Sequence, residues 1–248
     1  MRVLNGADAF ALELSKTAQA VLLRRLGVPA PRAWTFNDLD AIRVRAAELP
    51  YPVLLKPEQG GSGARIVLVE SFAHLEALLT QRPEHWLPDN LLLLQEYFPT
   101  DPAKGIVRME FLGGELLYAM RVISHGRFNL CPAPVCNPEG GEGGVCEIPA
   151  EQNAAPPVEF YPYPEVPAQA VEWGKRVIAG GKLDVGGVEY LETQDGRLMF
   201  YDVNANSNLR PSIAQAFGFD PFERVVDFLV REMKRGGATA APRAAATT

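Results

Sequence analysis

The sequence predicts an α+β protein in which antiparallel hairpins alternate with amphipathic helices. One hairpin is indicated by Asp195-Gly196 between two β-like runs, because a type I′ turn requires positive φ at both central residues. A second pair of strand-like runs meets at Gly113-Gly114. Further segments, beginning with residues 7–26, carry apolar side chains at helical spacing. Together these patterns favour sheets of paired strands that are covered by helices.

Composition and charge restrict the classes to which the chain can belong. Its 248 residues suffice for one large domain or two small ones, and 47% of them are hydrophobic. A net charge of −6 argues against nucleic acid as a partner, since phosphate backbones attract basic surfaces. No apolar run approaches the roughly 18 residues that span a bilayer, and residues 1–10 lack the apolar core of a signal peptide. We therefore expect a cytoplasmic protein without a membrane partner.

The N-terminal third combines helices with a Gly-rich turn. The helix over 7–26 ends at Gly27, and its Lys16 is expected to face solvent on helical spacing alone. A strand over 33–36 and a helix that begins at Asn37 follow. Lys56 then ends a strand just before the turn GGSG, whose backbone N–H groups can approach an anion closely. These residues by themselves fit a flap over phosphates and a plain β-turn equally well.

The middle of the chain offers two further candidate positions. An apolar strand over 91–96 ends in Glu96-Tyr97-Phe98, which fits either an adenine pocket or an ordinary strand exit. The hairpin over 105–123 contains Arg121, whose neighbours Met120 and Val122 point the other way. An arginine in an apolar strand needs an anionic partner, either a phosphate or a carboxylate of the later hairpin.

The segment over 131–167 is rich in Pro and Gly and is expected to form a long loop. The spacing of its three cysteines is typical of neither a disulfide framework nor a common zinc site. A helix over 167–180 precedes the Asp195-Gly196 hairpin, and a last helix begins at Asp220. The apolar stripe of this last helix is expected to pack on the core, and residues 236–248 are expected to be a disordered tail.

The hairpin around Asp195-Gly196 carries the strongest chemical signal. A two-residue loop puts Glu189 opposite Asp202, Leu191 opposite Phe200 and Asn204 opposite Gly187. Two facing carboxylates repel each other unless a cation lies between them. Three oxygen-bearing side chains without a nearby His or Cys suit a hard cation such as Mg²⁺. The alternative is a solvated hairpin face with two unrelated acids.

The order of these motifs resembles the ATP-grasp superfamily, and most closely its glutamate-ligase (RimK-like) branch. The motifs are a helical Lys, a strand-Lys-Pro before a Gly loop, Gln-Glu-Tyr, a strand Arg, and a Glu followed by Asp-x-Asn on a hairpin. The resemblance covers roughly residues 10–235. It implies two α+β lobes with nucleotide between them: a linking helix over 1–31, a small lobe over 32–95 with the Gly-rich flap, and a large lobe over 96–235 with the metal site.

The resemblance also implies roles for individual residues. Lys16 and Lys56 match the lysines that hold nucleotide phosphates, and Arg121 matches a catalytic arginine that stabilises the acyl-phosphate. The remaining matches are a flap at Gly60, Gly61, Ser62 and Gly63, an adenine contact at Glu96, Tyr97 and Phe98, and a metal site at Glu189, Asp202 and Asn204. The implied cofactors are ATP and one or two Mg²⁺ ions, or Mn²⁺ in their place.

The implied reaction is ATP-dependent ligation of a carboxylate to an amine, on small molecules or peptides, through an acyl-phosphate. Alternatives are an ATP-binding subunit without ligase turnover and a phosphotransferase that stops at phosphorylation. The family normally carries a preceding α/β domain, whereas this sequence begins at the linking helix. Either a partner protein supplies that domain, or the chain is a fragment, or the enzyme works without it.

Overall fold

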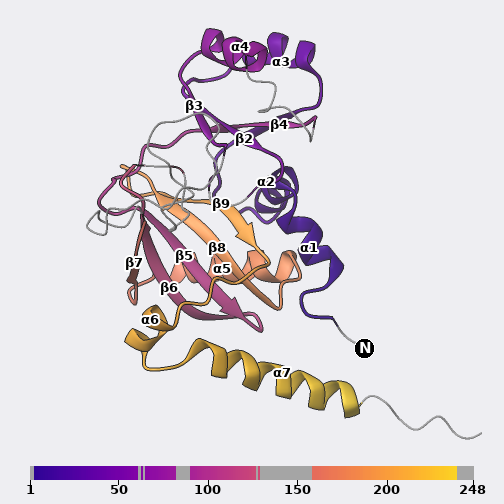
Figure 1. Ribbon diagram of the computed structural model, residues 1–248, viewed down its shortest axis with the longest axis vertical. Coiled ribbons are helices and arrows are strands. Elements are labelled where there is room, and N and C mark those ends of the chain that lie inside the picture. Colours follow the sequence, from indigo (N-terminus) through magenta and orange to yellow (C-terminus); the bar gives the residue numbers. More distant parts are fainter. Residues whose placement is uncertain are drawn as a thin grey trace, which may run out of the picture.

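Two antiparallel sheets, one above the other, form the framework of the protein (Figure 1). This computed structural model describes residues 3–60, 63, 65–81, 90–126, 128 and 158–238. The strand orders are β1-β4-β2-β3 and β7-β6-β5-β8-β9. The predicted α+β class is confirmed. None of the helices in the described residues is long and apolar enough to cross a bilayer.

The four-stranded sheet consists of β1 (Ala33–Phe36), β2 (Val53–Pro57), β3 (Val67–Val69) and β4 (Leu92–Glu96). Helices α3 (Leu39–Ala46) and α4 (Phe72–Gln81) cover its outer face, at the top of Figure 1. Apolar side chains from both helices and from β2, β3 and β4 form one buried cluster. The cap of α3 is Asp38 rather than the expected Asn37, because the Asp38 carboxylate accepts a hydrogen bond from the Ala41 amide at 2.7 Å.

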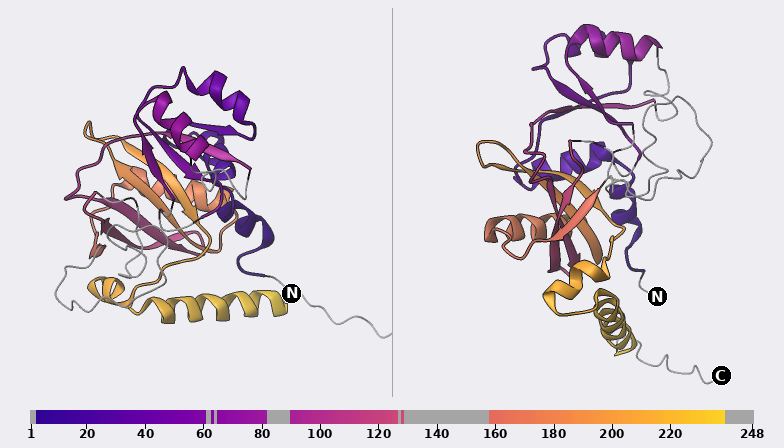
Figure 2. Two further views of the ribbon diagram at one scale, coloured as in Figure 1. Left: turned by 45° about the horizontal axis from the view of Figure 1, so that its top comes forward. Right: turned by 60° about the vertical axis from the view of Figure 1, so that its left-hand side comes forward.

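The five-stranded sheet consists of β5 (Ile106–Leu112), β6 (Glu115–Ile123), β7 (Glu159–Pro162), β8 (Val185–Glu192) and β9 (Leu198–Asn204). Helix α5 (Ala168–Gly180) packs on one face of this sheet, where it shares a buried cluster with strand residues such as Met109 and Phe111. The helix approaches closely because Gly174 has no side chain: a Cβ there would lie 2.5 Å from the Phe111 ring. The other face turns toward the four-stranded sheet (Figure 2).

The predicted helix over 7–26 is two helices, α1 (Ala7–Glu13) and α2 (Lys16–Arg25). Ser15 separates them, because its extended backbone interrupts the helix and its hydroxyl accepts a hydrogen bond from the Ala18 amide at 3.0 Å. Lys16 is therefore the first residue of α2 rather than a mid-helix residue. Since α2 packs on β9 and contacts β1, this helix connects the two sheets.

The register of β8 and β9 differs in part from the prediction. A two-residue loop would put Leu191 opposite Phe200. The structure closes the hairpin with a three-residue loop instead, since the Thr193 amide donates to the Arg197 carbonyl at 2.9 Å, and Phe200 faces Tyr190. Phe200 consequently lies in the helical core and not on the face that carries the carboxylates.

A bulge in β9 restores the predicted pairing of the polar residues. It inserts Tyr201 as one extra residue, after which Asp202 lies opposite Glu189 and Asn204 lies opposite Gly187. The longer loop shifts the register by one residue and the bulge shifts it back. Glu189 therefore faces Asp202, as a two-residue loop without a bulge would also have placed it.

The C-terminal part contains α6 (Pro211–Ala214), the short 3₁₀ helix η3 (Gln215–Phe217) and α7 (Pro221–Ala238). The expected packing of the α7 stripe on the core is wrong. Phe228 is buried against Gly113, but most of the stripe is exposed, namely Phe222, Val226, Leu229, Val230 and Met233. The expected tail begins later than Gly236, since α7 reaches Ala238, and residues 239–248 lie outside the described part. Most of the expected loop over 131–167 also lies outside it, but 159–162 form β7.

Candidate nucleotide and metal site

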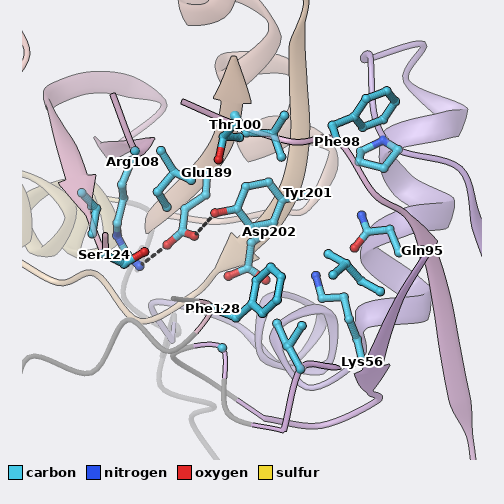
Figure 3. A pocket seen from close by; sticks show the side chains of 18 of the residues that line it. Lys56, Gln95, Phe98, Thr100, Arg108, Ser124, Phe128, Glu189, Tyr201 and Asp202 are labelled. Atoms are coloured by element: carbon cyan, nitrogen blue, oxygen red, sulfur yellow. Dashed lines mark hydrogen bonds and ion pairs between the residues drawn. The ribbon is translucent and has the colours of Figure 1, made fainter. Parts of the chain in front are cut away.

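A cleft of about 380 Å³ lies between the two sheets, and its lining comes from both of them. Lys56 and Gln95 approach it from the four-stranded sheet, whereas Arg108, Glu189 and Asp202 approach it from the five-stranded sheet (Figure 3). The cleft is large enough for a nucleotide-sized ligand and carries charged groups of both signs at its centre.

One end of the cleft is lined by the strand exit Glu96, Tyr97 and Phe98, as predicted. The Glu96 carboxylate does not project freely into the cleft, because Arg32 holds it through Nη2 at 3.1 Å and through its backbone amide at 3.2 Å. Phe98 lies 5.3 Å from the Arg197 guanidinium, which stacks over its ring. This end therefore offers an apolar, aromatic surface suited to a planar heterocycle.

Both predicted lysines reach the centre of the cleft. Lys56 is buried with its ammonium 5.3 Å from the centre of the Tyr201 ring, and Lys16 forms an ion pair with Asp202. Burial lowers the pKa of Lys56 to about 8, and the positive charge of Lys16 acts in the same direction, although Asp202 opposes both. The expectation from spacing that Lys16 faces solvent is wrong, because Ser15 starts a new helix that turns this side chain inward.

The turn after Lys56 is fastened to α2 by Glu58. The Glu58 carboxylate accepts hydrogen bonds from Ser15 Oγ, from the Thr17 amide at 3.1 Å and from the Thr17 hydroxyl at 2.7 Å. It thereby caps the N-terminus of α2, where unpaired amides favour a negative charge. Gly60 and Gly63 line the cleft as predicted, whereas Gly61 and Ser62 lie outside the described residues.

The three predicted metal ligands converge on one surface. Asp202 lies opposite Glu189 and next to Asn204, whose amide nitrogen donates to Asp202 Oδ2 at 2.9 Å. Burial and the nearby charge of Asp202 raise the pKa of Glu189. Burial also acts to raise the pKa of Asp202, but the ammonium groups of Lys16 and Lys56 outweigh it and hold this pKa below its usual value.

Tyr201 positions Glu189 because the bulge turns its ring into the cleft. Its hydroxyl donates to Glu189 Oε2 at 3.0 Å, while Arg108 Nη1 donates to Glu189 Oε1 at 2.9 Å (Figure 3). Both oxygens of this buried carboxylate are thus oriented. The sequence pattern does not reveal Tyr201, because a regular hairpin places it on the opposite face from Asp202.

Arg108 and Glu110 were also missed, although both carry charge within a buried strand. Glu110 is fully buried and accepts hydrogen bonds from Arg108 Nε at 2.6 Å and from Ser207 Oγ at 2.5 Å. Gly187 makes room for the arginine, since a Cβ at that position would lie 2.7 Å from Arg108 Nη2. The alternation Arg108-Met109-Glu110 in an apolar strand was the available signal, because residues two apart share a face.

Arg121 does not take the position expected of it. It pairs with Val107 in the sheet, so its side chain lies on the face opposite to Arg108 and is not part of the cleft lining. There it stacks on Tyr163, with 4.3 Å between the guanidinium carbon and the ring centre, and lies 3.6 Å from a Glu192 oxygen. The anionic partner of Arg121 is therefore Glu192, a carboxylate of the β8–β9 hairpin, rather than a phosphate. The arginine that lines the cleft is Arg108.

The donor set fits a hard divalent cation. Glu189, Asp202 and Asn204 offer only oxygen ligands, and the repulsion between the two facing carboxylates would be relieved by a positive ion. The described residues contain no group of three or more His, Cys, Asp or Glu side chains suited to a metal. The candidate ligands are therefore this pair of carboxylates and the neighbouring amide. The residues present therefore fit Mg²⁺.

Comparison with solved structures identifies the fold. An ATP-grasp ligase, PsnB, in complex with a minimal precursor, Mg and ADP superposes with a TM-score of 0.62 at 21% identity, over 94% of this chain and 62% of that chain. The chain has an ATP-grasp fold. The two sheets described above are the two lobes of this fold, with the cleft between them.

Sequence comparison finds two similar proteins that match most of this chain. It is 28% identical over 209 residues to beta-citrylglutamate synthase B of Danio rerio, which covers 82% of this chain and 44% of that protein. It is 22% identical over 227 residues to a probable alpha-L-glutamate ligase of Haemophilus influenzae, covering 91% of this chain and 66% of that protein. The chain thus spans less than two thirds of either relative. No known family model matches the sequence.

Proposed function

We propose that the protein is an ATP- and Mg²⁺-dependent ligase that joins a carboxylate to an amine. The observation that carries this proposal is the convergence of Lys16 and Lys56 with the facing Glu189 and Asp202 in one interlobe cleft of an ATP-grasp fold. Lysines suit phosphate oxygens, and the carboxylate pair suits the cation that accompanies them. ATP would lie with its base toward Tyr97 and its phosphates toward the two lysines.

The chemistry follows from the poor reactivity of a carboxylate. A substrate carboxylate oxygen attacks the γ-phosphorus of ATP, the bond to the bridging oxygen breaks, and ADP leaves with an acyl-phosphate remaining. Bound Mg²⁺ would supply neutralising charge to the phosphates. Lys56 and Lys16 would hold the phosphate oxygens, and Lys16 would exchange its partner Asp202 for them.

The second step forms the C–N bond. The amine attacks the acyl carbon, inorganic phosphate leaves with the former carboxylate oxygen, and the amine loses a proton to solvent. The guanidinium of Arg108, fixed by Glu110 and Glu189, supplies positive charge beside the cleft centre, where the negative tetrahedral intermediate would form. The names of the two relatives make L-glutamate the first amine to test.

The test is release of ADP that depends on Mg²⁺ and on a carboxylate substrate, followed by mass-spectrometric detection of the amide product. A panel of citrate, other carboxylic acids and short peptides, each with L-glutamate or another amine, serves as substrate. Glu189→Gln keeps the shape of the side chain but removes its charge, so turnover should fall by at least about 100-fold. Circular dichroism checks that the variant remains folded.

A matched pair of arginine variants tests the position of the reacting groups. Arg108→Lys should lower turnover by about 10-fold or more, because a lysine cannot reproduce the forked contacts to Glu110 and Glu189. Arg121 lies on the other face of the sheet, and its guanidinium does not line the cleft. Arg121→Lys should therefore leave turnover within about two-fold of wild type. The reverse ranking would contradict the assignment, and ADP release without any ligated product would favour a phosphotransferase.

A further inference from the structure

Helix α7 has an apolar face that the rest of the described chain leaves exposed. On the inner side of the helix, Phe228 is buried against Gly113 in the turn between β5 and β6. The other side carries five large apolar side chains that are 40–76% exposed, namely Phe222, Val226, Leu229, Val230 and Met233. We call these five residues the α7 stripe. Monomeric proteins rarely expose a contiguous apolar patch of more than a few hundred Å², and larger patches mark contacts with other molecules.

The spacing of the α7 stripe is that of a contact between helices. Four of its members follow one another at intervals of four, three and four residues, namely Phe222, Val226, Leu229 and Met233. This alternation is typical of a coiled-coil seam, in which the side chains of one helix insert between those of another. Helix α7 runs unbroken over 18 residues, so the seam extends over about three turns. The α7 stripe therefore suits a second helix.

Charged residues along one flank of the α7 stripe determine the direction of that second helix. Glu223, Asp227 and Lys234 each follow a residue of the stripe by one position, so they lie on the same flank. This flank is acidic in the first half of α7 and basic in the second half. All three side chains are exposed, and none of them forms an ion pair with another described residue. The flank is thus free to meet charges of another molecule.

An antiparallel second copy of α7 matches both the apolar and the charged pattern. In such a pair a two-fold axis passes between Val226 and Leu229, and each end of one stripe meets the opposite end of the other. The acidic half of one flank then meets the basic half of the other, so that Glu223 lies near Lys234 of the partner subunit. A parallel pair would place each charged residue beside its own copy, where like charges repel.

The position of α7 in the molecule permits this contact. The helix lies below the five-stranded sheet, at the end of the molecule opposite the four-stranded sheet (Figure 1). None of the α7 residues that the structure describes lines the interlobe cleft, so both clefts of a pair would lie away from the contact. One helix from each copy gives an interface near the lower limit of about 1,000 Å² for specific contacts, and we expect a micromolar Kd. In dilute solution the chain is then a monomer with an exposed stripe.

We propose that the protein forms a homodimer in which the α7 helices of two copies pack antiparallel through the α7 stripe. Burial of apolar surface supplies the affinity, and the flanking charges select the antiparallel direction. Phe222 then lies near Met233 of the partner subunit, and contact between an aromatic ring and a thioether is favourable. The inference does not depend on the proposed ligase function, because no residue of the cleft takes part.

Sedimentation equilibrium of the full chain between about 1 and 200 µM measures the association. Wild type should pass from monomer to dimer within this range. Val226→Glu places two like charges at the centre of the contact and should keep the protein monomeric at the highest concentration. Circular dichroism checks that this variant is folded, as expected because Val226 is 57% exposed in a single copy. A wild type that stays monomeric throughout would overturn the inference and leave the stripe to a different protein.

Reversal of the flanking charges tests the direction of the pair. Glu223→Lys and Lys234→Glu should each raise Kd about 10-fold or more, because each variant replaces two attractive contacts by two repulsive ones. The double variant has opposite charges again and should return Kd to within about three-fold of wild type. A parallel pair predicts no such rescue, since each residue there faces its own copy.

Arg224→Glu is the matched control, because it lies in the same helix and changes the net charge as Lys234→Glu does. Arg224 follows Phe222 by two positions and therefore lies on the opposite side of α7, with its guanidinium 5.4 Å from the centre of the Phe219 ring. It should keep Kd within about three-fold of wild type. Single reversals that leave Kd unchanged, or a double variant as weak as the single ones, would overturn the antiparallel contact.

Discussion

At the scale of single residues, Lys56 has the most informative environment. Its ammonium lies in a buried position over the Tyr201 ring, with Lys16 and Asp202 nearby. Burial removes water from the charge, which is why its pKa falls to about 8. A phosphate beside the ammonium would restore the lost stabilisation and raise the pKa again. In the proposed function, binding of a nucleotide would therefore be coupled to protonation of this one residue.

This coupling predicts a pH dependence of nucleotide affinity. Below pH 8 Lys56 is already protonated, so MgADP binds without proton exchange at this residue. Above pH 8 the free protein holds a neutral amine and the complex holds an ammonium, so binding takes up a proton and affinity falls as pH rises. Calorimetry at pH 8.5 in buffers of different ionisation enthalpy should reveal the uptake.

The variant Lys56→Met should bind MgADP more weakly and show no proton uptake from this position. Lys182→Met is the matched control, because Lys182 is exposed and pairs with Asp8 away from the cleft. Equal proton uptake in wild type and Lys56→Met would contradict the assignment of the phosphate site.

At the scale of elements, α7 shows how a helical stripe can mislead. Its apolar residues recur at helical spacing, which predicts a buried face. In the structure the helix lies below the lower ends of the strands of the five-stranded sheet (Figure 1), and it buries Phe228 rather than the stripe. Phe228 covers Gly113 in the turn between β5 and β6, where positive φ and the nearby ring both require glycine.

This arrangement predicts unequal costs for two truncations in the same helix. Phe228→Ala should lower the free energy of unfolding by about 3 kcal/mol, because it leaves a cavity over the β5–β6 turn. Met233→Ala should change it by less than about 0.5 kcal/mol, since Met233 is 76% exposed. Denaturation in urea, monitored by circular dichroism, gives both values. An equal loss of unfolding free energy in Phe228→Ala and Met233→Ala would mean that the apolar stripe of α7 is its packed face.

In the β8–β9 hairpin the predicted pairing of the carboxylates is present although the predicted loop is not. Its loop and its bulge each shift the register by one residue, so the pairing of Glu189 with Asp202 survives although its derivation from a two-residue loop was wrong. The bulge also turns Tyr201 toward Glu189. Bulges commonly re-aim a side chain near a functional site, and this one places a hydroxyl against the Glu189 carboxylate.

At the scale of the whole molecule, the site exists only where the two sheets and α2 meet. Lys56 comes from the four-stranded sheet, Asp202 from the five-stranded sheet, and Lys16 from the helix that contacts both. A ligand that contacts all three would link the two sheets and α2 through one molecule. Such a ligand should stabilise the folded protein by mass action.

We therefore expect MgADP to raise the thermal midpoint of unfolding. At 100 times its Kd the added stability is about 2.7 kcal/mol, which corresponds to a shift of a few degrees for a chain of this size. Excess EDTA should remove most of the shift, because the nucleotide then lacks the cation held by Glu189 and Asp202. Differential scanning calorimetry measures both effects, and an EDTA-insensitive shift would argue against the metal site.

The sequence by itself determined the α+β class and most helices and strands, which follow from side-chain periodicity and turn chemistry. The repulsion of facing carboxylates made Glu189, Asp202 and Asn204 candidate metal ligands, whereas Lys56 became a candidate phosphate ligand through the resemblance to a family. Gly61 and Ser62 remain a prediction, since they lie outside the described residues.

Only the tertiary structure decided which arginine faces the cleft and which face of α7 is buried. Arg108 and Arg121 both lie in strands of one hairpin with similar apolar neighbours, and their roles depend on which face of the sheet the helices cover. The place of Tyr201 depends on a bulge that no residue pattern predicts. Residue patterns give periodicity within an element, whereas the assignment of a face requires the packing of one element on another.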